Sequence, residues 1–194
     1  MELSRRAVGT LTVAGIAGLA GCSGSTSFSA DYAVTDTGDT GYEQTGQRQP
    51  TMTRTFAGQE VNVTNTVTEY RKEMELSFFG GSSDVGVFSA FTTPQVNVAG
   101  QSFNPISDIS NKELAERFQN RFDSMDGLGQ ESSEEVEILG SARTVTKFSA
   151  TVTVEGNEVP IFLLLAKFEH ESDIVVPMGI FPQERQDEEG PNIR

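Results

Sequence analysis

The sequence contains few of the residues on which several common kinds of protein depend. Among its 194 residues are one cysteine, Cys22, one histidine, His170, and no tryptophan. One cysteine cannot form a disulfide bond within the chain, which excludes a disulfide-stabilised scaffold. A zinc site built from cysteine and histidine also lacks enough ligands. We therefore expect no metal site and no cofactor.

Basic residues are scarce too. The chain has 14 Lys and Arg against 28 Asp and Glu, a formal net charge of -14. Binding nucleic acid through its phosphates requires a basic surface, so this charge excludes nucleic acid as a partner. The carboxylates are dispersed and only four bases are lysines, which resembles proteins of salt-loving archaea, where molar salt screens the repulsion. The alternative is an acidic surface that binds calcium or a basic partner.

The first 21 residues have the pattern of a cleaved export signal. Arg5 and Arg6 form a positive start, and residues 7–21 follow without a charge. This stretch is rich in Gly and Thr and is shorter than the ~20 apolar residues that a membrane-spanning helix needs. The paired arginines, in Ser4-Arg5-Arg6-Ala7-Val8, resemble the signal of the twin-arginine export route, which carries folded proteins.

The uncharged stretch ends in Leu19-Ala20-Gly21, directly before the sole cysteine. This ending resembles a lipobox, in which small residues precede the cleavage site and the sulfur of the new N-terminal cysteine carries the lipid. We therefore predict lipidation of Cys22, with the membrane as a partner and the protein on the extracytoplasmic face of the cell membrane. The alternative is a short uncleaved anchor with an incidental buried cysteine, which also places the chain outside the cytoplasm.

Composition divides the rest of the chain into three parts. Residues 22–50 hold many Ser, Thr, Gly, Asp and Gln and few apolar residues, which predicts a lipidated cysteine followed by a flexible linker. Residues 51–182 have the length of a single ordinary domain. Residues 183–194 contain clustered acidic residues and are predicted to form a solvated tail. The chain stops soon after that cluster, which leaves open that the domain is truncated.

Apolar and polar residues alternate over much of the predicted domain, which is the pattern of half-buried strands. Candidate strands cover residues 59–69, 85–99, 134–139, 143–155, 158–169 and 174–181. Gly156-Asn157 lies between two of them and predicts a tight hairpin. Pro177 in the last candidate predicts a sheet edge or a bulge.

One helix is predicted to begin after Ser110, because Ser110 and Glu113 have the spacing of a capping box. An apolar stripe through Leu114 and Phe118 follows, and Gly127 stands where helices commonly end. Together with the strands, this helix predicts an α+β fold, an antiparallel sheet of about six strands with one main covering helix.

The sequence shows no pattern of catalytic residues. His170 lies among Glu169, Glu171 and Asp173, which could supply a general base or oxygen ligands for calcium; we interpret this stretch as an acidic turn between two strands. No serine lies in a Gly-x-Ser-x-Gly motif, and the glycine-rich residues 80–84 lack the ending of a P-loop. We therefore expect no catalytic residues and a protein that is not an enzyme.

Two further segments have a polar or a structural interpretation. Asn62-Val63-Thr64 is an N-glycosylation sequon on the polar side of a predicted strand, and Asn62 is a candidate modification site if the domain is exported. Residues 93–105 contain Pro94 and Pro105, which favour extended backbone before them. We interpret this segment as a connector into the helix, with a binding loop as the alternative.

The twin-arginine lipobox start, Thr93-Pro94-Gln95, Asn104-Pro105 and the hairpin over residues 145–168 together resemble a family of uncharacterised haloarchaeal lipoproteins. The resemblance covers the whole chain and implies export, lipid anchoring and a salt-adapted α+β domain. It implies no activity and no catalytic residues. A small sheet with one covering helix is also similar to the Mog1/PsbP-like architecture, by analogy only.

We therefore expect a membrane-anchored extracytoplasmic lipoprotein whose domain is a non-enzymatic binding or accessory module. Its partner would be an unknown envelope protein or a solute. One alternative is a solute- or ion-binding lipoprotein that serves a transporter. Another alternative is an enzyme that uses carboxylates.

Overall fold

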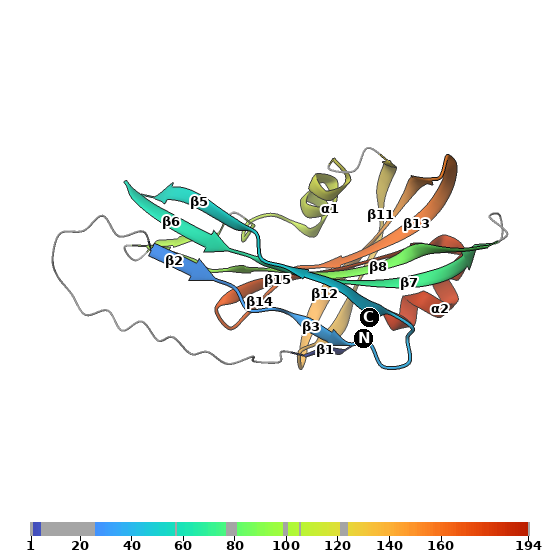
Figure 1. Cartoon of the computed structure of the whole chain (residues 1–194), viewed down its shortest axis with the longest axis horizontal. Coiled ribbons are helices and arrows are strands. Elements are labelled where there is room, and N and C mark those ends of the chain that lie inside the picture. Colours follow the sequence, from blue (N-terminus) through green and yellow to red (C-terminus); the bar gives the residue numbers. More distant parts are fainter. Residues whose placement is uncertain are drawn as a thin grey trace.

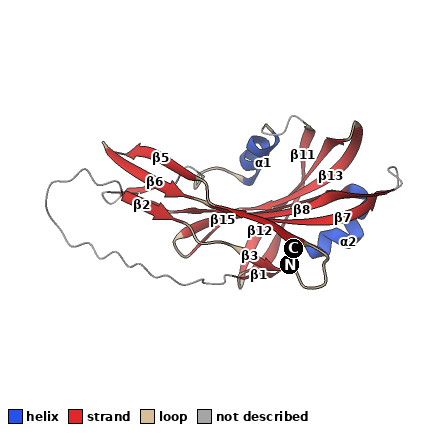
Figure 2. Ribbon diagram, viewed as in Figure 1, coloured by secondary structure: helices blue, strands red, loops and turns tan. Residues whose placement is uncertain are grey.

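Strands make up most of the protein (Figure 2). The computed structural model describes residues 2–4, 26–56, 58–76, 81–98, 101–104, 106–120 and 124–193. With 65% strand, 13% helical residues and two short α-helices, the protein is mostly β. The expectation of an α+β fold with about six strands and one main covering helix is therefore wrong. It failed because several strands carry Thr, Ser, Gln and Glu in place of alternating apolar residues.

The elements follow one another along the chain as coloured in Figure 1. The described strands are β1 (Glu2–Ser4), β2 (Thr26–Ser29), β3 (Val34–Asp36), β4 (Glu43–Arg48), β5 (Thr51–Phe56), β6 (Gln59–Thr64), β7 (Thr66–Leu76), β8 (Gly81–Pro94), β9 (Val96–Val98), β10 (Gln101–Phe103), β11 (Met125–Ile138), β12 (Ser141–Val154), β13 (Asn157–Ala166), β14 (Phe168–His170) and β15 (Asp173–Pro182). The described helices are α1 (Asn111–Gln119), the 3-10 turn η1 (Gln183–Arg185) and α2 (Gln186–Asn192).

The largest sheet has eight strands in the order β11-β12-β13-β15-β8-β7-β4, with β14 also paired to β15. All of its neighbouring strands are antiparallel. The predicted hairpin is confirmed as β12 and β13. Its turn is Glu155-Gly156, one residue earlier than predicted, with φ of 50° and 83°. Positive φ at both positions is what a two-residue hairpin turn of this hand requires.

Pro177 lies inside this sheet, because β15 has β8 on one side and β13 and β14 on the other. The sheet-edge interpretation of Pro177 is therefore wrong. On the β13–β14 side, the ladder pairs Leu165 with Met178 and Phe168 with Val175. Lys167 interrupts the strand between those pairs, so the proline stands where the ladder is already broken. A residue without a backbone N–H is tolerated at such an interruption.

Successive residues of β13 point to opposite faces of the large sheet. Leu163 and Leu165 pack with Phe148 of β12 and Ala115 of α1 on one face. Leu164 faces the other way and lines a small pocket with Ile193, which follows α2. The helices α1 and α2 therefore cover opposite faces of the sheet, as Figure 1 shows.

Residues 26–50 belong to the folded body, whereas the sequence predicted a flexible linker. β2 pairs with β6, and β4 pairs with β7. Ala33 and Tyr42 are 5% and 2% exposed and belong to the main core cluster. The prediction failed because composition counts apolar residues, whereas an edge strand is also held by backbone hydrogen bonds and by a few buried side chains.

Residues 183–193 also differ from the solvated tail that the sequence predicted. They form η1 and α2, and Glu189 and Ile193 are 0% and 8% exposed. The acidic residues of this segment misled the prediction because acidic side chains also stabilise the first turn of a helix.

A smaller sheet with the order β2-β6-β5 extends from one end of the body (Figure 1). β4 leads into β5, and β6 leads into β7, so two neighbouring stretches of chain pass through both sheets. Val61 and Val63 of β6 are buried with Val96 of β9. The opposite face of this small sheet carries polar side chains, among them Thr53 and Asn62.

The helix predicted after Ser110 is confirmed as α1. The Ser110 hydroxyl accepts a hydrogen bond from the backbone N–H of Glu113 at 3.1 Å. The helix ends at Gln119, and Gly127, which was predicted to end it, lies in β11 with φ of 69°. Among the described residues, no helix is long and apolar enough to span a membrane.

Candidate functional site

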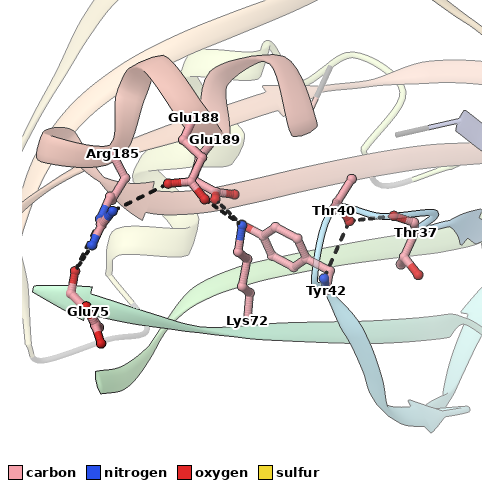
Figure 3. A network of polar contacts seen from close by, with 8 residues as sticks. All are labelled: Thr37, Thr40, Tyr42, Lys72, Glu75, Arg185, Glu188 and Glu189. Carbon is pink, nitrogen blue, oxygen red and sulfur yellow. Dashed lines mark hydrogen bonds and ion pairs between the residues drawn. The ribbon is translucent and has the colours of Figure 1, made fainter. Parts of the chain in front are cut away.

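Charged and polar side chains gather where α2 meets β7 (Figure 3). β7 supplies Lys72, α2 supplies Glu188 and Glu189, and the residues before β4 supply Tyr42. We call these four residues the α2 cluster. They come from segments that lie far apart in the sequence, since Lys72 and Glu189 are 117 residues apart.

Local sequence explains how each segment presents its side chain. The alternation of β7 places Tyr70, Lys72 and Met74 on one face of the sheet. The first turn of α2 contains Glu188 and Glu189, where the positive end of the helix dipole favours carboxylates. Before β4, the Thr40 hydroxyl donates to the carbonyl of Thr37 at 2.6 Å, which closes the turn that leads to Tyr42.

An ion pair lies at the centre of the α2 cluster. The Nζ atom of Lys72 is 2.5 Å from Oε1 of Glu189 and 3.3 Å from Oε1 of Glu188. The Glu189 side chain is 1% exposed and that of Lys72 is 14% exposed. Nζ also lies 5.8 Å from the centroid of the Tyr42 ring, within the range of a cation–π contact. Lys72 therefore neutralises a carboxylate that is shielded from water.

The cluster also contains two buried polar atoms, the Tyr42 hydroxyl and Oε2 of Glu189, and the Tyr42 hydroxyl interacts with the Glu189 carboxylate. Burial raises the pKa of Tyr42 well above its usual range, and the nearby Glu189 carboxylate raises it further. Burial lowers the pKa of Lys72, but hydrogen bonding and the charge of Glu189 and Glu188 raise it by more. Both groups therefore stay protonated at neutral pH, and neither is a base or a nucleophile there.

Two strand glycines allow the cluster and α2 to approach the sheet. Gly86 of β8 pairs with Lys72, and a Cβ atom there would overlap Cε of Met74 and lie 3.1 Å from the Tyr42 hydroxyl. A Cβ atom at Gly179 of β15 would overlap Cγ2 of Ile193. Glycine inside a strand is a sequence signal for such a close approach. Neither Gly86 nor Gly179 was predicted to mark such an approach.

Further hydrogen bonds hold η1 and α2 against the large sheet. Near the cluster, Arg185 donates to the backbone carbonyl of Glu75, and Lys147 Nζ lies 3.2 Å from Oε1 of Gln186. A molecule that is to react with Glu189 would first have to displace α2, since the carboxylate is buried beneath it. The α2 cluster therefore has the arrangement of a structural contact that holds α2 against the sheet.

Beneath Ile193 lies a pocket with a volume of about 20 Å³. Its lining includes Phe88, Leu164 and Pro177. This volume holds about one water molecule. It is far below the ~300 Å³ or more of a typical small-molecule site.

The structure places Asn62 in the middle of β6, on the polar face of the small sheet. Its Oδ1 atom accepts a hydrogen bond from the Thr53 hydroxyl at 2.7 Å. Its modification stays a prediction. Arg5, Arg6 and the lipobox residues lie outside the described residues. These lipobox residues are Leu19, Ala20, Gly21 and Cys22.

His170 ends β14 in the turn region that the sequence singled out. Asp173 is 2% exposed, and its Oδ2 atom accepts a hydrogen bond from the backbone N–H of Asp31 at 3.1 Å. Within the described ranges, no group of three His, Cys, Asp or Glu side chains could hold a metal ion. Asp173 thus ties the residues after β2 to the start of β15.

The segment before α1 is held by Asn104 and Lys167, of which only Asn104 lies in the segment that the sequence singled out. Asn104 donates to the carbonyl of Pro94 at 3.0 Å, and its Oδ1 atom accepts from the N–H of Ile106 at 2.9 Å. The ammonium group of Lys167 donates to the carbonyls of Ile106, Ser107 and Ile109. These bonds give the segment a role as a connector, and Lys167 was missed because its partners lie about 60 residues away.

Comparisons with known proteins identify a family for the chain. A family model described as Domain of unknown function (DUF6517) matches residues 30–194. The chain belongs to this family. It is also similar to the crystal structure of a protein of unknown function, PA94 from Pseudomonas aeruginosa, with 9% identity and a TM-score of 0.34 over 73% of this chain and 89% of that chain. That likeness is too weak to carry an argument. No curated protein matches the chain.

Proposed function

We propose that the chain is a lipid-anchored protein of the extracytoplasmic membrane face, and that its β domain is a non-enzymatic binding or accessory module. The observation that carries this proposal is the position of the sole cysteine. Cys22 follows Leu19-Ala20-Gly21 and stands four residues before Thr26, where β2 begins. Four residues span at most about 14 Å. A lipid on Cys22 would therefore hold the small sheet directly beside the membrane.

The proposal includes the export route and the environment. Arg5 and Arg6 support twin-arginine export, which delivers a folded domain. The net charge of -14 and the four lysines support an origin in salt-loving archaea, where screening permits such a charge. A salt-adapted surface and a lipid anchor are compatible, because anchoring depends on buried methylene groups and needs no basic patch when two chains are attached.

The α2 cluster supports a non-enzymatic role. Its carboxylate is buried, and its lysine and tyrosine stay protonated. The pocket beneath Ile193, with a volume of about 20 Å³, is too small to enclose a solute. We therefore propose that the module contacts an envelope protein through its surface, and we do not favour solute delivery to a transporter.

Fractionation of cells that express the native chain tests this proposal, with the Cys22→Ser chain as a matched control. The native chain should enter the membrane fraction, resist extraction by salt and be released by detergent. The Cys22→Ser chain has no sulfur to carry the lipid and should lose that detergent dependence. Replacing Arg5 and Arg6 by lysine should retain the precursor inside the cell. A native chain that is soluble inside the cell, with a free thiol, would contradict the proposal.

A further inference from the structure

β5 is an exposed edge strand of the small sheet. It ends the order β2-β6-β5, and no other strand in the described part of the chain pairs with its outer side. Its six residues pair with β6 without a register shift. Residues 51–55 are all exposed, and Met52 is 40% exposed. Figure 1 shows β5 at the outside of the small sheet, away from the main body.

Both edges of the large sheet carry features that prevent strand addition, and β2, the other edge of the small sheet, is only four residues long. β11, at one edge of the large sheet, has two register shifts. It also carries five acidic residues, Asp126, Glu131, Glu134, Glu135 and Glu137. β4, at the other edge, has a register shift between Gln44 and Gly46, and Pro50 follows it. Charges, bulges and proline all discourage edge pairing. β5 has no proline and no shift, and its one charge is Arg54.

The sequence of β5 is nearly symmetric about Thr53. Thr51 and Thr55 flank it at a distance of two residues, and Met52 and Arg54 flank it directly. In an antiparallel pair centred on Thr53, each Thr51 would face Thr55 of the second copy, and each Met52 would face Arg54 of the second copy. We propose that β5 pairs in this register with β5 of a second copy of this chain, about a two-fold axis at Thr53. A two-fold interface requires such self-complementarity.

The proposed pairs are chemically compatible. Opposite threonines are among the favourable cross-strand pairs. The aliphatic stem of Arg54 can cover Met52 while its charge stays in water. Alternation also keeps the faces continuous, because Thr51, Thr53 and Thr55 of both copies would lie on the same side of the joined sheet. The two arginines would also place positive charge at the contact between chains that each carry a net charge of -14.

Six strand residues bury less surface than a standard interface of ~1,600 Å². We therefore expect a weak association that depends on concentration. A membrane anchor would raise the local concentration. That gain rests on the proposed function, but the pairing itself does not.

Disulfide trapping tests the register. The full chain with Cys22→Ser has no thiol, so Thr53→Cys in that background supplies the only one. Directly opposite residues of an antiparallel pair have Cα atoms about 4.5–5.5 Å apart, which a disulfide can bridge. Oxidation at molar salt should trap a dimer of Thr53→Cys. Thr51→Cys should not be trapped alone, since its two copies would lie about 13 Å apart. It should be trapped when mixed with Thr55→Cys.

Ser133→Cys, in the edge strand β11 of the large sheet, is the matched control for random collision. A charge test gives a second, independent measurement in the Thr53→Cys background. Met52→Lys would face Arg54 of the second copy and should slow trapping several-fold, whereas Met52→Glu should not. Because molar salt would screen this repulsion, the two variants are compared at the lowest salt concentration at which both are folded. The far-ultraviolet circular dichroism of each variant confirms folding.

Two results would overturn the proposal. One is trapping of Thr53→Cys no faster than that of Ser133→Cys, and the other is equal trapping of Met52→Lys and Met52→Glu. Because every chain in these tests lacks Cys22, failure here leaves the lipid anchor untouched, and failure of the anchor leaves these results valid.

Discussion

The large and small sheets differ in what covers them. The large sheet is covered on one face by α1 and on the other by α2 and residues that precede β4, and its core includes Phe148, Leu163 and Phe181, each at most 1% exposed. The small sheet buries Val61, Val63 and Val96 on one face only. This difference indicates that the large sheet supplies most of the stability, while the small sheet presents a polar face and a free edge.

The largest expected effect is that of salt on the whole domain. Below about 0.5 M salt, screening weakens and the dispersed carboxylates repel one another, so the domain should lose structure. The small sheet should open first, because fewer contacts hold it. Hydrogen exchange at decreasing salt would then show amides of β6 losing protection before those of β13. An unchanged melting temperature from low to molar salt would contradict this expectation.

Breaking the ion pair of the α2 cluster should destabilise the large sheet next most strongly. Lys72→Met leaves the Glu189 carboxylate buried without its partner, which should cost about 3–5 kcal/mol of unfolding free energy. Denaturant unfolding at molar salt measures this loss. The double variant Lys72→Met with Glu189→Leu should recover most of it, because an apolar pair leaves no buried charge. If the double variant were as unstable as Lys72→Met alone, the loss of stability would not come from the unpaired Glu189 carboxylate.

Buried apolar residues of the two sheets should differ in their effect. Leu163→Ala should cost about 2–5 kcal/mol, and Val61→Ala about 1–2 kcal/mol. Val159→Ala is the matched control, since Val159 lies in the main core and, like Val61, is 0% exposed. We expect the unfolding midpoint to fall more for Val159→Ala than for Val61→Ala. Equal shifts would mean that the two sheets are equally important for stability.

Alkaline pH should act through the α2 cluster. The pKa values of Tyr42 and Lys72 are higher in the folded protein than their ordinary values of 10.0 and 10.5. Above these pH values the unfolded chain therefore binds fewer protons than the folded chain. The contribution of Tyr42 and Lys72 to the stability of the folded protein is therefore complete below about pH 10 and is lost as the pH rises. Melting curves should show that Tyr42→Phe loses less stability between neutral and alkaline pH than the native chain. A steeper loss in Tyr42→Phe would refute this role.

The smallest effect is expected at the exposed surface of α1. Arg117 lies 2.8 Å from Glu113 in an i,i+4 pair, and both side chains are about half exposed. Arg117→Ala should cost about 0.3–0.5 kcal/mol, and molar salt should screen most of that. Denaturant unfolding at two salt concentrations measures it. A loss comparable to that of Lys72→Met would remove the distinction between buried and exposed pairs.

Local chemistry was readable from the sequence. The hairpin of β12 and β13 was predictable because alternating strands flank a glycine-containing turn. The start of α1 was predictable because Ser110 accepts from the backbone three residues ahead. Both features depend on residues that are close in sequence, and both were confirmed.

Long-range contacts were not readable in the same way. The residues around Lys72 do not predict its ion pair with Glu189, which is 117 residues away. The residues around Tyr70 likewise do not predict that its hydroxyl accepts a hydrogen bond from the backbone N–H of Thr35. Residues 26–50 looked like a linker because their strands hold few apolar side chains and take their stability from neighbours. Gly86 and Gly179, both inside strands, were the sequence features that indicate where other side chains pack closely against the sheet.

Mass spectrometry of the intact protein, purified from the cell envelope with detergent, tests the central claim most directly. We predict a chain that begins at Cys22 and whose mass exceeds that of residues 22–194 by a lipid on the sulfur. A chain that retains Arg5 and Arg6, with an unmodified Cys22 thiol, would contradict the account.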